Sequence, residues 1–167
     1  MKEPALVLIK PDGISKGLIG SVLSKFAQAN LEIVGLRIAK ASRRLAEAHY
    51  QHLKNEPFFD DVICYLTGKY HSHKKLLTII YYGNNAIKKC RAIAGATNPE
   101  EADPESIRGS YGRITTKGLF ENVVHVSSDK KEAEREIKLW FNPDDITVEI
   151  YPTKLRVVEA HKESCWI

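Results

Sequence analysis

Short apolar segments alternate with segments of helical period along most of this 167-residue chain. The first, residues 5–9, is a continuous apolar run that stops at Lys-Pro-Asp-Gly, a pattern typical of a buried strand followed by a turn. Apolar residues then repeat at helical spacing over residues 19–26, and they alternate with small or polar residues over residues 34–39. A strand, a helix and a second strand are therefore predicted in this order.

The same alternation continues through the middle of the chain. Ser42 is suited to cap a helix that runs past His49 and Leu53, and Pro57 marks the exit from that helix. The apolar pattern predicts three more elements, namely a helix over residues 58–66, a strand over residues 76–81 and a helix over residues 85–94 that Gly95 ends.

A long irregular stretch over residues 96–121 is rich in Gly, Pro, Thr and charged side chains. A loop of this length is usually functional or disordered. Residues 123–126 then form a short β-branched segment typical of a buried strand, with Ser127 or Ser128 placed to cap the helix that follows. That helix is predicted from the apolar spacing of Ala133, Ile137, Trp140 and Phe141.

This order of elements predicts an α/β sandwich of the ferredoxin-like kind, in the α+β class. Four strands would form one antiparallel sheet, and helices would cover one face of it. No linker divides the chain, and its length and 43% hydrophobic content suit one domain. We expect that domain over residues 1–150, followed by a C-terminal tail over residues 151–167 that packs on the domain or on a neighbouring subunit.

Composition narrows the class of protein. No run approaches the roughly 20 apolar residues of a membrane span, and no signal-peptide pattern follows Met1, so a soluble cytoplasmic protein is expected. The three cysteines, Cys64, Cys90 and Cys165, lack paired or metal-ligand spacing, which favours free thiols over disulfides or a zinc site. A net charge of +4 suits an anionic ligand but does not distinguish a nucleotide from a nucleic acid.

One histidine, His125, stands where the predicted strand of residues 123–126 gives way to a helix. The N-terminus of a helix favours an anion, and an imidazole is a competent phosphoryl acceptor near neutral pH. This placement suggests a phosphohistidine. The alternative is a histidine that only satisfies hydrogen bonds at the end of a strand, and for an isolated histidine this alternative is the commoner one.

Side chains that could bind phosphate occur at several separate places. Lys10 follows the first predicted strand at a tight turn, whereas Arg91, Thr97 and Arg108 lie in or near the irregular stretch. Together they could clamp a polyphosphate. Each of them taken alone is more often a solvated side chain, and the sequence does not show that they converge.

Three further residues could orient a nucleotide. Phe58 could stack on a base or pack in the core, while Asn122 and Tyr50 could bind a ligand or the backbone. The sequence has neither the G-x-x-x-x-G-K-[ST] phosphate loop nor a G-x-G-x-x-G segment after a strand. Any nucleotide site must therefore be built from side chains.

Taken together, these segments resemble those of the nucleoside diphosphate kinases, over about residues 5–141. The matching blocks occur in the order of that family and at nearly its spacing, so the resemblance is far more specific than any single motif. The blocks are residues 9–13 (IKPDG), 17–20 (GLIG), 49–50 (HY), 57–59 (PFF), 95–99 (GATNP), 107–109 (IRG), 122–125 (NVVH) and 136–141 (EIKLWF).

The resemblance implies a ferredoxin-like fold, assembly into hexamers or tetramers, and a ping-pong reaction. In that reaction the γ-phosphoryl group of a nucleoside triphosphate such as ATP is transferred to a nucleoside diphosphate. His125 would attack through Nδ1 and carry the phosphate. Glu136 would hold and polarise the imidazole, and Ser127 would support Glu136.

The resemblance also implies how the nucleotide is held. Mg²⁺ would arrive with the nucleotide and bridge its phosphate oxygens, so no protein metal site is implied. Neither a membrane nor a nucleic acid is required as a partner. The implied roles are phosphate binding by Lys10, Arg91, Thr97 and Arg108, shaping of the phosphate pocket by Tyr50, base stacking by Phe58 and sugar contact by Asn122.

The chain departs from the usual pattern of the family at Val126, where Gly commonly follows the histidine, and at Ser110, where Asp usually follows Arg-Gly. A few extra residues also lie near residues 69–75 and between Gly109 and Asn122. These departures leave a catalytically weakened, regulatory family member as one alternative. A nucleic-acid-binding module of the same fold is a lesser alternative. Such a module needs a run of exposed aromatic residues on its central strands, and this sequence has no run of that kind.

Overall fold

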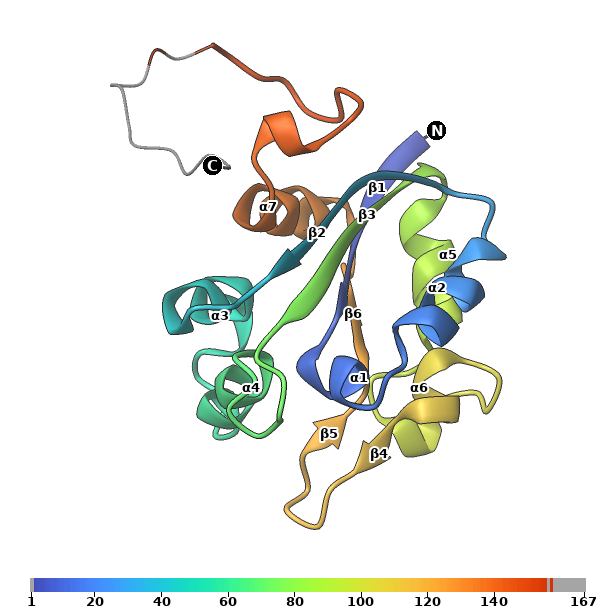
Figure 1. Ribbon diagram of the computed structural model, residues 1–167, viewed down its shortest axis with the longest axis vertical. Coiled ribbons are helices and arrows are strands. Elements are labelled where there is room, and N and C mark those ends of the chain that lie inside the picture. The colour runs from blue at the N-terminus through green and yellow to red at the C-terminus, as the bar shows by residue number, and fades with distance from the viewer. Residues whose placement is uncertain (1, 156, 158–167) are drawn as a thin grey trace, which may run out of the picture.

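A four-stranded antiparallel sheet forms the centre of the protein in the computed structural model, which describes residues 2–155 and 157 (Figure 1). The strand order is β2-β3-β1-β6, so the last strand of the sheet pairs with the first strand of the chain. This arrangement confirms the predicted ferredoxin-like α+β sandwich. The strands span Lys2–Ile9 (β1), Glu32–Ala39 (β2), Leu76–Asn84 (β3) and Val124–Val126 (β6).

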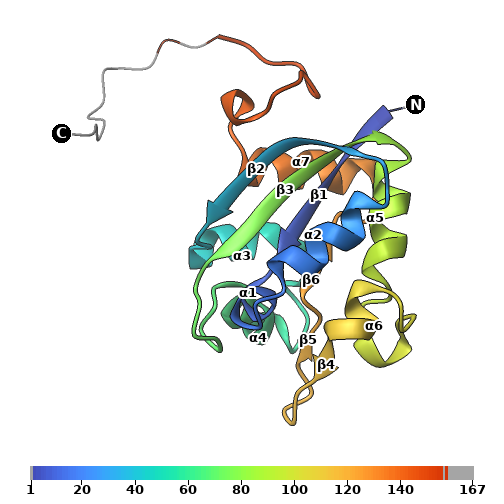
Figure 2. The ribbon, with the colours of Figure 1, turned by 45° about the vertical axis from the view of Figure 1, so that its right-hand side comes forward.

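Helices cover both faces of this sheet, so the prediction of one covered face is wrong (Figure 2). Residues 5–9 of β1 are all fully buried, and their side chains alternate between two hydrophobic clusters. Val7 packs with α2 and α5, whereas Leu6 packs with α3, α4 and α7. An apolar run without polar alternation is what a strand buried on two faces requires. The helices span Ile19–Ala27 (α2), Arg43–His49 (α3), Phe59–Leu66 (α4), Ala86–Ala94 (α5) and Lys130–Trp140 (α7).

The predicted helices form with small changes at their ends. Ser42 caps α3, because its hydroxyl accepts a hydrogen bond from the Leu45 N–H at 3.1 Å. The continuation predicted beyond His49 is a separate 3₁₀ turn, Gln51–Leu53. The segment after β1 begins a short helix, Pro11–Ser15 (α1), where only a turn was predicted, since proline suits the first position of a helix.

The start of α7 differs from its prediction. Asp129 caps this helix and accepts a hydrogen bond from the Glu132 N–H at 2.9 Å, so the prediction of Ser127 or Ser128 as the cap is wrong. Ser127 is fully buried, and its hydroxyl bonds inside the protein instead. Phe141 follows the helix in an extended conformation.

The irregular stretch between α5 and β6 is folded. It contains a 3₁₀ turn, Pro99–Glu101, and a short helix, Ile107–Tyr111 (α6). Two short strands, Arg113–Ile114 (β4) and Phe120–Glu121 (β5), then pair as an antiparallel hairpin. This hairpin lies between Gly109 and Asn122, the stretch in which the resemblance implies a few extra residues.

The chain after α7 makes a further 3₁₀ turn, Pro143–Asp145, and then packs Tyr151 against the cluster on the α7 face of the sheet. Leu155 is fully exposed. Residues 156 and 158–167 lie outside the described residues. The packing of the tail on the domain or on a neighbouring subunit therefore stays a prediction.

Two predictions from composition can be compared with the structure. Cys64 and Cys90 are free thiols, as predicted, while Cys165 lies outside the described residues. Within residues 2–155 and 157, no helix is long and apolar enough to cross a membrane.

Candidate active site

A cavity of about 520 Å³ opens between β6, the segment that joins α3 to α4, and the β4–β5 hairpin. Ser127 and Glu136 do not line it but are buried beside His125. The cavity brings together the other residues predicted for a nucleotide site, although they are scattered along the chain. These residues are Lys10, Tyr50, Phe58, Arg91, Thr97, Arg108, Asn122 and His125.

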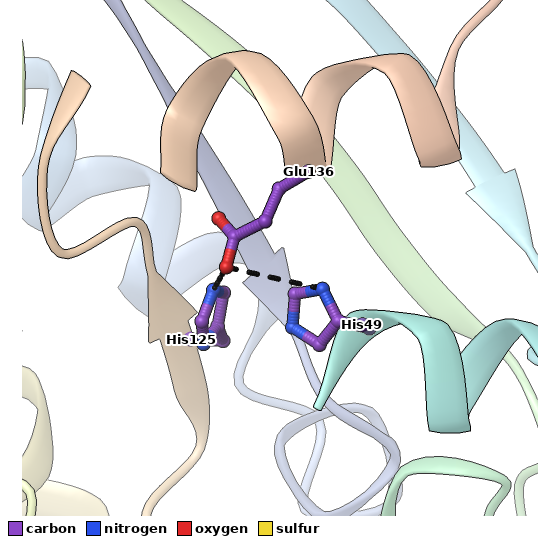
Figure 3. Close-up of side chains that lie close together, drawn as sticks. All are labelled: His49, His125 and Glu136. Atoms are coloured by element: carbon purple, nitrogen blue, oxygen red, sulfur yellow. Dashed lines mark hydrogen bonds and ion pairs between the residues drawn. The ribbon is translucent and has the colours of Figure 1, made fainter. Parts of the chain in front are cut away.

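A buried carboxylate holds the imidazole of His125. Glu136 of α7 reaches this ring, and the distance from His125 Nε2 to Glu136 Oε1 is 2.8 Å (Figure 3). The other carboxylate oxygen, Oε2, accepts a hydrogen bond from Ser127 Oγ at 2.5 Å. Because a carboxylate can only accept, Nε2 carries the proton of a neutral imidazole and Nδ1 keeps its lone pair. Nδ1 points away from Glu136 and is the nitrogen that is free to react.

The surroundings of Glu136 keep it ionised. Burial alone would raise the pKa of Glu136, but the neighbouring His125 and the hydrogen bonds from His125 and Ser127 outweigh burial and lower this pKa. Ser127 is fixed in turn, since its hydroxyl accepts a hydrogen bond from the Leu6 N–H at 3.2 Å. The sheet and α7 thus set the orientation of His125 together.

Lys10 lines the cavity but is almost fully buried. Its ammonium donates a hydrogen bond to Asn122 Oδ1 and lies 4.4 Å from the centre of the Tyr65 ring. Asn122 also donates to the Thr97 carbonyl oxygen at 2.7 Å. Burial lowers the pKa of Lys10 to about 8. An anion in the cavity would supply the charge partner that favours the protonated form.

Arg108 is also buried, and backbone carbonyls tether it. Its guanidinium donates to the Gly95 oxygen at 2.8 Å and to the Val124 oxygen at 3.1 Å, while its Nε has no hydrogen-bond partner among the described residues. Burial lowers the pKa of Arg108 to about 10. Ser110 takes no part in this tether, because its hydroxyl donates to the Pro104 carbonyl. Arg108 therefore stays tethered to the Gly95 and Val124 carbonyls although Ser110 departs from the family pattern.

The other predicted residues lie nearer the solvent or at the end of α3. Phe58 is 44% exposed and lines the cavity, so the alternative that it packs in the core is wrong. Arg91 and Thr97 are also exposed at the cavity. The ring centre of Tyr50 lies 6.0 Å from that of His125, and burial raises the pKa of the Tyr50 hydroxyl. The cavity thus offers both an aromatic face and cations to one ligand.

The backbone between Asn122 and His125 adopts an uncommon conformation. Val123 has a φ of 64°, which is strained for a β-branched residue. Its N–H donates to Asp12 Oδ2 at 2.9 Å, and its carbonyl accepts a hydrogen bond from the Lys10 N–H at 2.8 Å. Asp12 is fully buried. The start of α1 therefore holds the strained residue in place.

Sequence reasoning missed three residues of this site. Asp12 was interpreted only as part of a turn, and Tyr65 and His49 only as parts of helices. His49 is fully buried, and its ring centre lies 4.3 Å from that of His125. Each of these contacts joins segments that are distant in the chain, so no local spacing signals them. The His-Tyr block at residues 49–50 was the one available signal for His49.

His49, His125 and Glu136 place possible metal-ligand atoms within 4.8 Å of one another. We assign no metal ion to them, because His125 and Glu136 bond to each other and His49 Nδ1 accepts a hydrogen bond from Trp140 Nε1 at 3.2 Å. Among the described residues that line the cavity, Asp61 is the one carboxylate. A cation in the cavity would therefore depend mainly on oxygen atoms of the ligand.

Known proteins resemble this chain over most of its length. The family profile for nucleoside diphosphate kinase matches residues 3–146. The nucleoside diphosphate kinase of Pyrococcus furiosus is 41% identical over 144 residues, which is 86% of this chain and 86% of that protein. The one from Methanocaldococcus jannaschii is 36% identical over 146 residues, which is 87% of this chain and 98% of that protein.

Solved structures share the fold. A halophilic nucleoside diphosphate kinase from Halobacterium salinarum, in complex with CDP, has a TM-score of 0.79 at 32% identity and covers 87% of this chain and 91% of its own. A transition-state mimic of the Borrelia burgdorferi enzyme, with bound vanadate and ADP, has a TM-score of 0.78 at 30% identity. The match covers 87% of this chain and 90% of the Borrelia chain. The chain therefore belongs to the nucleoside diphosphate kinases, phosphotransferases that pass a phosphoryl group between nucleotides through a phosphohistidine.

Proposed function

We propose that His125 is the residue that accepts the γ-phosphoryl group of ATP or another nucleoside triphosphate. Its Nδ1 would bond to the γ-phosphorus as the bond from phosphorus to the bridging oxygen breaks, and the nucleoside diphosphate would leave. A second diphosphate would then take the phosphoryl group from Nδ1. The observation that carries this proposal is the hydrogen bond from Nε2 to Glu136, which leaves the Nδ1 lone pair free at the cavity.

Glu136 and Ser127 would act on the reaction through His125. Bonding of Nδ1 to phosphorus draws electron density from the ring, so a carboxylate at Nε2 stabilises the positive charge that develops there. Glu136 is suited to this role because it is ionised and fully buried. Ser127 would keep the carboxylate in register through the hydrogen bond to Oε2.

Three cations would bind the β- and γ-phosphates. Lys10, Arg91 and Arg108 converge on one cavity, where they would stabilise the charge that builds on the phosphate oxygens in the transition state. The Thr97 hydroxyl would add a hydrogen bond to the phosphates, and Tyr50 would shape the phosphate pocket beside His125.

The nucleoside would lie toward the solvent. Phe58 would stack on the base, because its ring is exposed at the cavity. An aromatic face accepts any base, so we expect broad base tolerance. Asn122 would contact the sugar, and its hydrogen bond to Lys10 would connect the sugar site with the phosphate site.

We also propose that Mg²⁺ enters with the nucleotide. Enzymes of this family are kinases that generally use a divalent metal together with the nucleotide. The lining of the cavity fits this role, because Asp61 is its one carboxylate among the described residues and already accepts a hydrogen bond from the Tyr70 hydroxyl at 2.8 Å. The phosphates would supply most of the oxygen ligands, and the ion would neutralise part of their charge.

A homo-oligomer is proposed through the edge strand β2. This strand ends the sheet and exposes the apolar residues Ile33, Leu36 and Ile38. Exposed apolar strand edges mark interaction sites. A second cavity, of about 550 Å³, adjoins this edge and is lined by Leu23, Ala27, Asn30, Leu31, Ile33 and Tyr81.

Domain bounds and location also remain proposals. We propose residues 1–150 as the catalytic domain and residues 151–167 as a tail, since the family profile ends at residue 146. We propose that the protein works in the cytoplasm, where free thiols such as Cys64 and Cys90 are common. Cell fractionation tests the location.

The alternative functions find less support in the structure. In the described part of the chain, helices cover both faces of the central strands β1 and β3, where a nucleic-acid-binding module of this fold would stack its bases. Val126 pairs with Val7 in the sheet and is buried, so its β-branched side chain occupies an ordinary strand position. We therefore propose an active enzyme, not a weakened family member.

Labelling with γ-labelled ATP and Mg²⁺ tests the role of His125. The full chain should acquire a phosphate on His125 that is labile in acid and stable in base. The variant His125→Ala should lose both the label and transfer to a second diphosphate while it still binds nucleotide, because the cationic side chains remain. The control His73→Ala changes an exposed histidine outside the cavity and should label normally. Label on another residue, or turnover by His125→Ala, would refute the assignment.

A further inference from the structure

His49 has no part in the reaction proposed above, although it lies against the phosphoryl acceptor. It is fully buried at the end of α3, and its ring plane makes an angle of 76° with that of His125. The ring centres are 4.3 Å apart. A neighbour this close influences which charge state the His125 ring prefers.

Trp140 determines where the proton of His49 lies. The indole Nε1–H donates to His49 Nδ1, so Nδ1 must hold a lone pair. Burial, together with the neighbouring His125, lowers the pKa of His49 well below its usual value, and the ring stays neutral. The proton therefore sits on Nε2. This nitrogen is buried and has no hydrogen-bond partner in the described part of the chain.

Figure 3 shows the direction of this N–H. The edge of His49 that carries Nε2 is turned toward the ring of His125, whereas Nδ1 lies on the side of Glu136. The electrons on the face of an aromatic ring attract an N–H dipole, but a positive charge on the ring repels it. The contact therefore stabilises the neutral imidazole of His125 relative to the imidazolium.

We propose that His49 is a positioning residue whose Nε2–H faces the ring of His125 and keeps that ring neutral for attack. The inference rests on the proposed role of His125, because an imidazolium has no lone pair on Nδ1 with which to accept a phosphoryl group. Glu136 favours the imidazolium, so the site needs groups that act in the opposite direction. Lys10 and Arg108 act in the same direction as His49. Among the described residues, the other titratable or charged side chains that line the cavity with His125 are Tyr50, His52, Asp61, Tyr65 and Arg91, and Arg135 lies 4.0 Å from Glu136 Oε1.

Nitrogen NMR of ¹⁵N-histidine-labelled full chain tests the proton position without any substitution. We expect His49 to remain neutral with its proton on Nε2 at neutral and mildly acidic pH, because burial holds its pKa well below the usual value. A proton on Nδ1 of His49, or protonation of His49 before His125, would overturn the proposal. The measurement does not depend on activity, so it is distinct from the labelling test of His125.

Two variants test the effect on the reaction. His49→Phe keeps a buried flat ring but removes the N–H, and His49→Gln is the matched variant that keeps an N–H donor. The rate of His125 phosphorylation would be measured in single turnovers across pH. In His49→Phe the pH below which the phosphorylation rate falls should move up by about half a pH unit or more. At a pH on this falling part of the profile, the variant should therefore react about threefold more slowly than wild type. In His49→Gln the pH below which the phosphorylation rate falls should stay close to the wild-type value.

Two results would show that His49 is merely structural. One is an equal shift in both variants, and the other is a loss of rate at every pH without a shift of the acid side. Circular dichroism and urea unfolding would establish that each variant is folded. Should His49→Phe not fold, the NMR result on the unsubstituted chain decides the proposal by itself.

Discussion

Lys10 shows how burial can change the use of one side chain. The residue is almost fully buried in the cavity wall, and burial lowers its pKa from 10.5 to about 8. A lysine is cationic below its pKa and neutral above it, and only the cation can stabilise phosphate charge. The kcat/KM of the free enzyme should therefore be highest below about pH 8 and should fall as the pH rises through this value.

Substitution of Lys10 connects this pH dependence to the residue. Lys10→Ala should lower kcat/KM by about 30- to 1000-fold, or about 2 to 4 kcal/mol, because the lost contact strengthens in the transition state. Lys10→Arg keeps a cation whose pKa is much higher, so the fall in kcat/KM should move to higher pH in this variant.

The control for these variants is Lys40→Ala, which removes an exposed lysine away from the cavity and should leave kcat/KM near wild type. Steady-state transfer from ATP to a second diphosphate, measured from about pH 6 to pH 10, gives the pH profiles of the wild type and of each variant. A wild-type profile that stays flat to pH 10, or a Lys10→Ala variant as active as wild type, would exclude Lys10 from the site.

At the scale of elements, the close approach of α1 to β6 determines where the reactive segment lies. Gly13 of α1 packs against Val123, the residue with the strained backbone. A Cβ added at Gly13 would meet Val123 Cγ1 at 2.9 Å and Ile9 Cγ2 at 3.0 Å. Overpacking of this kind costs about 1 to 3 kcal/mol, which exceeds the gain of about 1 kcal/mol that alanine brings to a helix.

We therefore expect Gly13→Ala to lower the free energy of unfolding and to slow phosphorylation of His125. The rate should fall because a displaced Val123 moves the adjoining Asn122. Urea unfolding and single-turnover labelling measure the two effects. Gly20→Ala is the matched control in α2, where an added Cβ meets nothing within 4 Å, and it should raise stability by about 0.5 to 1 kcal/mol. Changes of the same sign in both variants would contradict this view of α1.

The elements were predictable where the chain signals them locally. The apolar run of β1 and the Ser42 cap of α3 appear in the structure as the sequence indicates. The sequence analysis did not predict that helices cover both faces of the sheet. The signal was present in β1, where apolar residues follow one another without alternating with polar ones. The cap of α7 was predicted one or two residues too early. Ser127 is a good capping residue by type, but its hydroxyl donates a hydrogen bond to Glu136 and does not cap the helix.

The site was predictable only in part, for a related reason. Family blocks identified residues such as Lys10 and Arg108, and the structure gathers them in one cavity. The burial that lowers the pKa of both, and the contact of His49 with His125, depend on how distant segments pack. Such packing has no counterpart in local residue spacing.

At the scale of the whole molecule, the cavity of the proposed active site and the apolar edge of β2 occupy different places. Residues of this one chain line the cavity, and none of them belongs to β2. Ile38 is 66% exposed and Leu36 is 51% exposed on β2, whose one partner strand in the described part of the chain is β3. On the outer side of β2, the Thr147 N–H donates a hydrogen bond to the Val34 carbonyl at 2.8 Å, before the exposed Leu36 and Ile38. An apolar edge that stays exposed at these two residues tends to associate, because a second chain can bury their side chains and pair with the backbone there. Assembly through β2 would leave the cavity intact.

If the proposed homo-oligomer forms through β2, the double variant Leu36→Lys/Ile38→Lys should convert it to smaller species, since each added charge would have to be buried at the contact. Sedimentation velocity measures the mass, and labelling with γ-labelled ATP measures the site in the same sample. We expect a lower mass with phosphorylation of His125 retained, because the residues of the cavity lie elsewhere. Asn55→Lys, which adds a charge at an exposed turn position outside β2 and outside the tail, is the control and should keep the wild-type mass. A double variant with the wild-type mass would place the interface on another face.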